Sequence, residues 1–270
     1  MVITARHDIQ GARAAAQCVV QTHHRLVEYL RAGQTLAEID QFVAETLADI
    51  DCRSAFLRYR MKGQPPFPSH ACLSLNDCVV HGTHNMTSEP IKPGDLLSID
   101  IGVIHDGWIG DAAWTYAIQE ASEDAQRLMA CGRQALQRGI KTMKAGRPLI
   151  DWAKVVQQYV ESECGFRLIR GLGGHGYGRK LHGAPFVSNL VPTHRGEWPD
   201  AWLAFKVGML LAVEPMLAIG TREVTSDDKR WPISTADGSL SAHYEAGILI
   251  TESGQCDLTE GMQQLPDIVG

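Results

Sequence analysis

Apolar positions with helical spacing open the chain. Over residues 6–32 the positions expected to face inward are Ile9, Val20, Leu26, Val27 and Leu30. Gly33 is expected to end this helix, since glycine readily adopts the backbone conformation that closes a helix. Thr35 and Glu38 have the spacing of a capping box, which predicts that a second helix begins immediately afterwards.

The same order of elements is predicted again further along the chain. Residues 122–145 favour a third helix that stops at Gly146, and Pro148 is expected to open a fourth that ends near Gly165. Each pair of helices is followed by β-rich runs, which are Cys72–Leu75, Leu96–Ile104, Met209–Met216 and Gly247–Thr251. Runs of helices and runs of strands, rather than strict alternation, predict an α+β fold.

Two short matches suggest that the chain contains an internal repeat. Residues 31–36 resemble residues 144–149, and residues 94–100 resemble residues 208–214, at offsets of 113 and 114 residues. We therefore expect one catalytic domain, residues 1–270, built from repeats of about 6–118 and 119–255. A cleft between two such halves is a common place for a site.

Two polar segments, residues 192–206 and 221–237, are expected to be surface loops at the edge of this cleft.

Composition narrows the range of partners and cellular locations. The net charge is −6 without a long basic run, which argues against a nucleic-acid partner. Seven cysteines without a CxxC pair predict reduced thiols in the cytoplasm. There is no apolar signal core and no run near the about 20 apolar residues that span a bilayer.

Three acidic residues occur inside apolar, strand-like runs. Asp100 follows Leu96-Leu97-Ser98-Ile99, Glu214 follows Leu210-Leu211-Ala212-Val213, and Glu245 precedes Ala246-Gly247-Ile248-Leu249-Ile250. A single acid of this kind is often a strand end at the surface. Three of them, two at repeat-related positions, favour buried carboxylates that are paired or bound to metal.

Further candidates lie in a hairpin and a glycine-rich loop. Asp111 follows the turn at His105-Asp106-Gly107, so a hairpin would bring it back beside Asp100. His175 lies in Gly173-Gly174-His175-Gly176-Tyr177-Gly178, with His182 seven residues later. This loop lacks the GxGxxG register of a nucleotide site, and a lone histidine is often structural.

Together these residues offer four carboxylates and at least one imidazole. Four carboxylates could not share a site without cations, and two divalent ions would nearly neutralise them. Oxygen-rich ligands with one nitrogen suit Mn, Fe, Co or Zn, and the physiological metal stays open.

Several motifs resemble those of the type I methionine aminopeptidases over about residues 5–262. The motifs are Ser74-Leu75-Asn76-Asp77-Cys78-Val79-Val80-His81-Gly82, Ser98-Ile99-Asp100 with Gly107-Trp108-Ile109-Gly110-Asp111, Gly174-His175-Gly176-Tyr177-Gly178-Arg179 with His182, Glu214-Pro215-Met216, and Ser241-Ala242-His243-Tyr244-Glu245. The resemblance implies the pita-bread fold, with two pseudo-twofold-related halves, antiparallel sheets backed by helices and a central metal site.

The resemblance also implies residue roles. Asp100, Asp111 and Glu245 would hold one divalent ion, and His175 and Glu214 would complete the other, with Asp111 and Glu245 bridging. Glu214 would act as the general base, His182 would donate to the scissile carbonyl, and His81 would contact the P1′ amide nitrogen. The implied activity is removal of N-terminal methionine from peptides and nascent proteins, with a small second residue preferred, by attack of a metal-bridging hydroxide.

The substrate pocket departs from the usual family pattern in places. Phe67, Cys72 and Trp231 match pocket positions. Leu181 stands where an aromatic residue is common, and Gln64 stands where a tyrosine is common. Gly183 replaces a glutamate, and Ala246-Gly247 replace His-Thr. None of these changes removes an expected ligand, but they bear on substrate preference.

Other functions stay open at this point. The alternatives are an Xaa-Pro peptidase, whose known members usually carry a large additional N-terminal domain, a specialised aminopeptidase acting on one peptide, and a non-catalytic binding protein. We expect a monomer that meets peptide or nascent-chain N-termini, with the ribosome as one candidate location.

Overall fold

The computed structural model describes residues 1–227 and 229–270. Its helices are α1 (Arg6–Tyr29), α2 (Leu36–Asp49), α3 (Glu123–Ile140), α4 (Ile150–Gln157), the π-helix η1 (Gln158–Glu163) and the 3-10 helices η2 (Pro199–Trp202) and η3 (Glu260–Gln264). Its strands are β1 (Arg53–Ser54), β2 (Cys72–Leu75), β3 (Cys78–Val80), β4 (Leu96–His105), β5 (Trp108–Ile118), β6 (Arg167–Leu168), β7 (Gly173–Gly176), β8 (Gly183–Ser188), β9 (Leu210–Val213), β10 (Met216–Ala218), β11 (Val224–Ser226), β12 (Ile233–Thr235), β13 (Ser241–His243), β14 (Ala246–Thr251), β15 (Gly254–Asp257) and β16 (Ile268–Val269).

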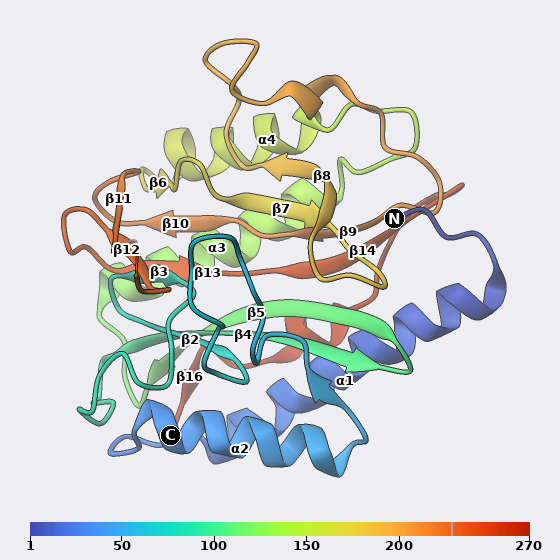
Figure 1. Ribbon diagram of the computed structural model, residues 1–270. Helices are drawn as coiled ribbons and strands as arrows, with labels where there is room; N and C mark the ends of the chain where they lie inside the picture. The colour runs from blue at the N-terminus through green and yellow to red at the C-terminus, as the bar shows by residue number, and fades with distance from the viewer. Residues whose placement is uncertain (228) are drawn as a thin grey trace.

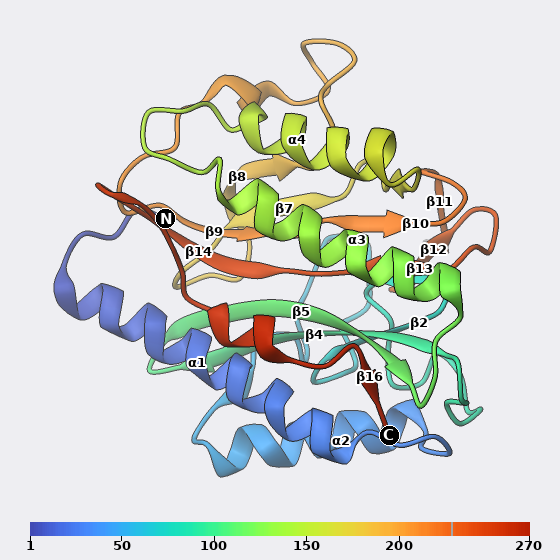
Figure 2. The ribbon, with the colours of Figure 1, turned by 180° about the vertical axis from the view of Figure 1, so that it is seen from behind.

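Two five-stranded sheets form the centre of the molecule. One has the order β1-β4-β5-β16, with β2 also paired to β4, and the other has the order β15-β14-β9-β7-β8. The two sheets lie one above the other in Figure 1, and α1, α3 and α4 cover the face that Figure 2 turns toward the viewer. Apart from the parallel pair β5–β16, the strand pairings are antiparallel, which confirms the predicted α+β class.

The helices agree with the sequence in number and order, but several ends differ. Thr35 and Glu38 form both hydrogen bonds of the predicted capping box at the start of α2. The first helix ends at Tyr29 because the backbone turns extended at Leu30, before Gly33 is reached. The third helix ends at Ile140, and α4 begins at Ile150, after Pro148 rather than at it.

The strands and loops also required corrections. The run Met209–Met216 is divided into β9 and β10 at Glu214-Pro215, where proline has no backbone N–H for a strand ladder. Residues 192–206 contain η2, and residues 221–237 contain β11 and β12. Because β12 pairs with β3, this second segment is part of a sheet rather than a free loop.

Matching glycine turns support the predicted repeat. Gly33 and Gly146 have φ values of 92° and 85°, and Gly94 and Gly208 have φ values of 89° and 86°. The N–H of Gly33 donates to Ile91 O at 2.8 Å, and that of Gly146 donates to Phe205 O at 2.9 Å. The division into repeats of about 6–118 and 119–255 stays a prediction.

The longest hairpin, formed by β4 and β5, packs directly against α1. Gly110 on β5 makes this close approach possible, since a Cβ atom there would lie 2.3 Å from Ala15 O of α1. The helix backbone cannot yield to such a contact without moving as a whole.

Among the described residues, no helix combines the length and the hydropathy that crossing a bilayer requires.

We therefore expect Gly110→Ala to lower the free energy of unfolding by about 1–3 kcal/mol, the usual cost of overpacking. The measurement is urea unfolding in excess chelator, so that metal binding does not contribute. Gly196→Ala is the matched control, because the nearest atom to its added Cβ is at 3.6 Å, an ordinary contact. Equal stability of the two variants would contradict the close packing of α1 on β5.

Candidate active site

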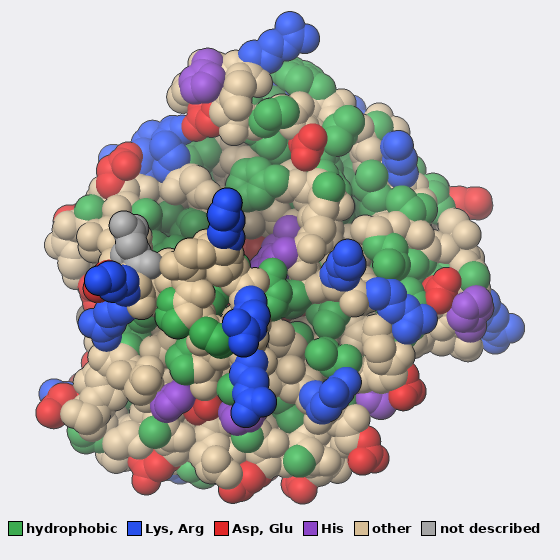
Figure 3. All heavy atoms as spheres, viewed as in Figure 1, with side chains coloured by type: hydrophobic (Ala, Val, Ile, Leu, Met, Phe, Trp, Pro, Cys, Tyr) green, Lys and Arg blue, Asp and Glu red, His purple; other side chains and the backbone are tan. Residues whose placement is uncertain are grey.

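A cavity of about 580 Å³ lies between the two large sheets. Figure 3 shows it as a hollow with histidine at the bottom and several Lys and Arg side chains around it. Asp100, Asp111, His175, Glu214 and Glu245, the five expected metal ligands, all line it. Residues far apart in the sequence, from both halves of the chain, therefore meet in one place.

The hairpin β4–β5 presents the two aspartates on one face. Asp100 pairs with Ala113, and Asp111 pairs with Gly102, so the two aspartates are diagonal neighbours across the ladder. The side chain opposite Asp111 is only a hydrogen atom, which leaves space beside its carboxylate. The predicted return of Asp111 to the side of Asp100 is thus realised by strand register.

His175 is brought in by close packing of β7 between β8 and β9. It pairs with Phe186 on β8 and with Ala212 on β9. The glycines on either side are required, because a Cβ on Gly174 would lie 2.2 Å from Ala212 O and one on Gly176 would lie 2.2 Å from Ala184 O. The glycine-rich loop therefore places an imidazole rather than a phosphate.

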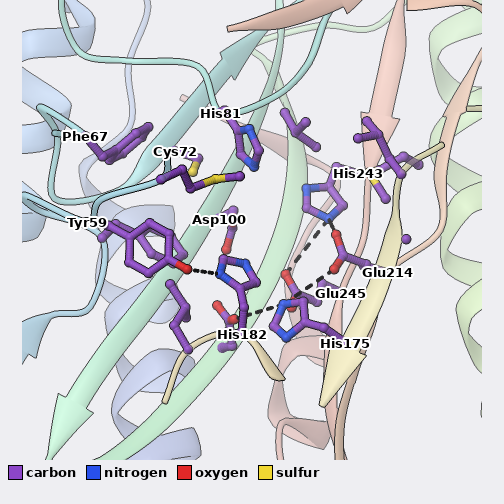
Figure 4. Close-up of a pocket in the computed structure, with 18 of the residues that line it drawn as sticks. Tyr59, Phe67, Cys72, His81, Asp100, His175, His182, Glu214, His243 and Glu245 are labelled. Atoms are coloured by element: carbon purple, nitrogen blue, oxygen red, sulfur yellow. Dashed lines mark hydrogen bonds and ion pairs between the residues drawn. The ribbon is translucent and has the colours of Figure 1, made fainter. Parts of the chain in front are cut away.

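The two glutamates lie at breaks between strands. Glu214 lies between β9 and β10, and Glu245 lies between β13 and β14. The backbone N–H of Glu245 donates to Ala113 O of β5 at 3.0 Å, which joins the two halves beside the aspartates. Figure 4 shows both glutamates directed toward His175 and His243.

Burial gives these acidic groups unusual proton affinities. It raises the pKa of Asp100 to about 7 and that of Glu214 to about 8, and it raises the pKa values of Asp111 and Glu245 well above their ordinary range. Of the described residues that line the cavity, none is Lys or Arg. The charge of the four carboxylates must therefore be balanced by protons or by added cations.

The donor set fits divalent cations. Oxygen atoms of Asp100, Asp111 and Glu245 are buried without a hydrogen-bond partner. Donor atoms of Asp111, His175 and Glu245 lie within 4.8 Å of one another, and so do those of Glu214, His243 and Glu245. Burial lowers the pKa of His175 to about 3, so its imidazole is neutral and able to bind metal. Buried oxygen acceptors without hydrogen-bond partners, next to neutral imidazoles, form the kind of donor set that a metal ion requires.

His182 and His175 lie side by side in the lining of the cavity, with ring centroids 4.4 Å apart. The Nδ1 of His182 lies 2.7 Å from the hydroxyl of Tyr59. Tyr59 lies in an irregular segment without a recognisable motif, so it could not be identified from the sequence. Burial raises the pKa of this tyrosine, so it keeps its proton and can donate it to His182.

The expected pocket residues divide into two groups. Phe67, Cys72, Leu181, Trp231 and His81 line the cavity. The Trp231 ring packs edge-on against the rings of Phe67 and His81, with ring centroids 5.1 Å and 5.8 Å apart. Its Nε1 donates a hydrogen bond to Pro65 O. Gln64 is not among the lining residues, and Tyr59 supplies the aromatic ring and hydroxyl on that side instead. The expected contact of Gln64 with substrate stays a prediction.

His243 is a second residue that the sequence analysis missed. It is buried, and its Nε2 lies 3.3 Å from Glu214 Oε2 and 3.9 Å from Glu245 Oε2. It stands within the quoted motif Ser241-Ala242-His243-Tyr244-Glu245, two positions before Glu245. Alternation along a strand puts residues two apart on one face, and this signal could have identified it.

Comparison with known proteins agrees with this geometry. The model of metallopeptidase family M24 matches residues 10–252. The chain is 36% identical over 261 residues to the methionine aminopeptidase of Aquifex aeolicus, covering 95% of this chain and 97% of that protein. It is also 36% identical over 256 residues to methionine aminopeptidase 1 of Mycobacterium tuberculosis, covering 93% and 92% of the two chains.

Solved structures give the same result. The methionine aminopeptidase of Rickettsia prowazekii superimposes with a TM-score of 0.87 at 29% identity, covering 96% of this chain and 100% of that one. That of Thermotoga maritima has a TM-score of 0.85 at 33% identity, covering 96% and 99%. These matches confirm the pita-bread fold. Since the family model spans most of the sequence and the relatives match nearly all of it, the chain belongs to metallopeptidase family M24.

Proposed function

We propose that this protein is a metal-dependent methionine aminopeptidase, which removes N-terminal methionine from peptides and nascent proteins with a small second residue. One observation carries the proposal: a cluster of four buried or half-buried carboxylates lies at one side of a cavity whose other side is apolar. Both 36%-identical relatives described above carry the name methionine aminopeptidase, which supports the same activity.

The expected ligands of two divalent ions are Asp100, Asp111, His175, Glu214 and Glu245. Bound cations would supply Lewis acidity toward a carbonyl and activation of water. The candidates are Co, Mn, Fe or Zn, because carboxylates with neutral imidazole suit these borderline ions. His243 adds a further nitrogen beside Glu214 and favours the same class of ion.

The chain's own residues suggest how the reaction is assisted. Glu214 is the proposed general base, since its carboxylate faces the cavity and holds a proton readily. Tyr59 donating to His182 Nδ1 leaves the proton of the neutral imidazole on Nε2. His182 can then donate from Nε2 to the developing oxyanion, and its fixed position avoids reorganisation during the reaction.

The opposite side of the cavity is suited to a long apolar side chain. Phe67, Trp231 and Leu181 line it, and aromatic rings gain about 0.3–1.5 kcal/mol from contact with a methionine sulfur. His81 lies against Trp231 and is the proposed contact for the P1′ amide nitrogen. Cys72, on β2, lies between these side chains and Asp100. Its Cα pairs with that of Asp100 on β4.

A likeness to Xaa-Pro peptidases extends to the fold alone. The X-Pro aminopeptidase of Thermotoga maritima has a TM-score of 0.74 at 18% identity, and this chain covers 63% of it. The monomeric state, the cytoplasmic location and any action at the ribosome stay predictions from the sequence.

The proposed activity predicts a ranking of peptide substrates. With Mn²⁺ or Co²⁺ added, we expect Met-Ala peptides to be cleaved fastest, Met-Lys and Leu-Ala peptides more slowly, and Ala-Pro peptides not measurably. Chelation should abolish cleavage, and Glu214→Gln, the control for contaminating peptidases, should lower kcat on the order of 10²–10⁴-fold. Faster cleavage of Ala-Pro would indicate an Xaa-Pro peptidase. No cleavage of any Met-initiated peptide would refute the substrate assignment.

The second prediction concerns the hydrogen bond between Tyr59 and His182. His182→Ala should lower kcat about 10²–10³-fold, the effect of losing one oxyanion donor. Tyr59→Phe should lower kcat about three- to tenfold, the value of one hydrogen bond. Metal affinity, measured by calorimetry, should be unchanged in both.

The double variant separates positioning from a general effect. If Tyr59 acts through His182, adding Tyr59→Phe to His182→Ala should cause no further loss. Equal losses from Tyr59→Phe in both backgrounds would show that the tyrosine acts independently.

The third prediction is a pH dependence of metal stabilisation. Asp100 and Glu214 have raised pKa values, so their contribution to the stability of the metal-free protein is full below pH 4 and is lost as the pH rises through about 7–8. Cations replace the protons, so the Mn²⁺-induced increase in Tm should grow from about pH 5 to about pH 8. The histidines do not compete in this window, because burial lowers the pKa of His175 to about 3 and that of His243 to about 4.

Thermal unfolding with and without Mn²⁺ measures this effect. Glu214→Gln should flatten the pH dependence, whereas Glu223→Gln, at an exposed position, should leave it unchanged. A metal-induced Tm increase that stays constant or shrinks as the pH rises would contradict competition between protons and cations.

A further inference from the structure

A second group of metal-binding side chains lies outside the cavity. It consists of Cys18 on α1, Cys52 just before β1, and His105 at the end of β4. Their donor atoms all lie within 4.8 Å of one another, and Cys52 Sγ is 3.6 Å from His105 Nδ1. None of the three lines the cavity between the sheets.

Strand register and helix packing create this group. Arg53 pairs with Ile104, so Cys52 and His105 are the next residues outward on the same two antiparallel segments. Helix α1 packs against β4 and brings Cys18 to them from outside the sheet. Three segments separated in sequence therefore converge, and no short motif such as CxxC could have announced the site.

The spacing of the donors suits a tetrahedral ion. Zn–S bonds of about 2.3 Å and Zn–N bonds of about 2.0 Å require donor atoms about 3.5 Å apart. All seven cysteines are free thiols, so both sulfur atoms are available. Three protein ligands leave the fourth position of such an ion for water, and His105, with 26% of its side chain exposed, keeps the site accessible.

The surrounding charges favour a cation. Asp51 and Asp106 are the carboxylates close enough to raise the pKa of Cys52, and neither Lys nor Arg contributes to the shifts of the two thiols. A hydrogen bond from Cys52 lowers the pKa of Cys18 to about 7, whereas the same contact and burial raise the pKa of Cys52 well above its ordinary range. A bound cation would then favour ionisation of the second thiol.

A carboxylate lies near the second ring nitrogen of His105. The Nδ1 of His105 faces the thiol, while its Nε2 lies 3.8 Å from Asp106 Oδ2. Histidine ligands usually direct their second ring nitrogen to a carboxylate, which fixes the tautomer and raises ligand basicity. At 3.8 Å the two groups form an ion pair when His105 is protonated rather than a hydrogen bond, and Asp106 adds negative charge next to the site.

We propose that Cys18, Cys52 and His105 form a binding site for a thiophilic divalent cation, with Zn²⁺ as the expected occupant, separate from the carboxylate centre. The bound ion would link α1, the segment entering β1 and the outer end of the β4–β5 hairpin. That hairpin carries Asp100 and Asp111 further along its strands, so the site would brace the element that presents both aspartates.

The chain contains a matched control for thiol proximity alone. Cys131 and Cys164 are also neighbours that share a hydrogen bond, but among the groups that shift the pKa of Cys131 there is no histidine. If two adjacent thiols were sufficient, this second pair would bind as well. If the histidine is required, only the first pair will bind.

The experiment is titration of the fully reduced protein with Co²⁺, followed by absorption spectroscopy. The carboxylate centre offers mainly oxygen and nitrogen ligands, with the thiol of Cys72 beside it, so a sulfur-to-cobalt charge-transfer band that survives Cys72→Ser reports the proposed site. We expect the band in the wild type and expect Zn²⁺ to displace it. Cys18→Ser and Cys52→Ser should remove it, and His105→Asn should weaken Co²⁺ binding at least about tenfold.

The controls are Cys164→Ser and Cys72→Ser, which should retain the full band. Absence of the band in the wild type, its survival in Cys18→Ser or Cys52→Ser, or its loss in Cys164→Ser or Cys72→Ser would overturn the proposal. Thiol alkylation and mass spectrometry of protein prepared without reductant give a second readout. A Cys18–Cys52 disulfide that excludes Co²⁺ would identify a redox pair and would also overturn it.

Discussion

Four carboxylates share one buried cavity with no basic side chain among its described lining residues, and this constraint governs much of the structure around them. Four negative charges in a low-dielectric site repel one another and lose hydration, so the metal-free protein holds protons there. The same desolvation keeps the neighbouring imidazoles neutral. A site that must be neutralised, and that offers neutral nitrogen beside oxygen, is suited to divalent cations.

The scaffold meets this constraint with backbone contacts rather than with side chains. Gly174 and Gly176 let β7 approach its neighbours so that His175 can reach the acidic cluster. Gly110 lets α1 lie directly on the strand that carries Asp111. The N–H of Glu245 donates to Ala113 O, so the two halves are fastened together beside the site itself. Ligand positions are thus fixed by strand pairing, which is stiffer than loop conformation.

Much of this arrangement could be predicted from the sequence because its signals are local. Acids within apolar runs identified Asp100, Glu214 and Glu245, and a turn between two strands placed Asp111. The capping box at Thr35 fixed the start of α2. Helix ends were less accurate, because the first and third helices end at Tyr29 and Ile140, before the expected glycines. Gln64 is not among the residues that line the cavity, whereas Tyr59 is. The irregular segment from Leu57 to Pro66 has no periodicity, so nothing in it indicated that Tyr59 would face the cavity.

The residues that were missed share one property, which is dependence on long-range register. His243 matters because β13 ends beside Glu214, and Cys18 meets Cys52 and His105 because α1 crosses the end of the first sheet. Such meetings are set by the packing of the whole fold, so single-sequence reasoning finds them only where strand alternation points to them. The β4–β5 hairpin shows the consequence most clearly. One end of it reaches the thiol group and its middle presents the aspartates, so a cation bound at the outer end would stiffen the strand pair on which the acidic centre depends.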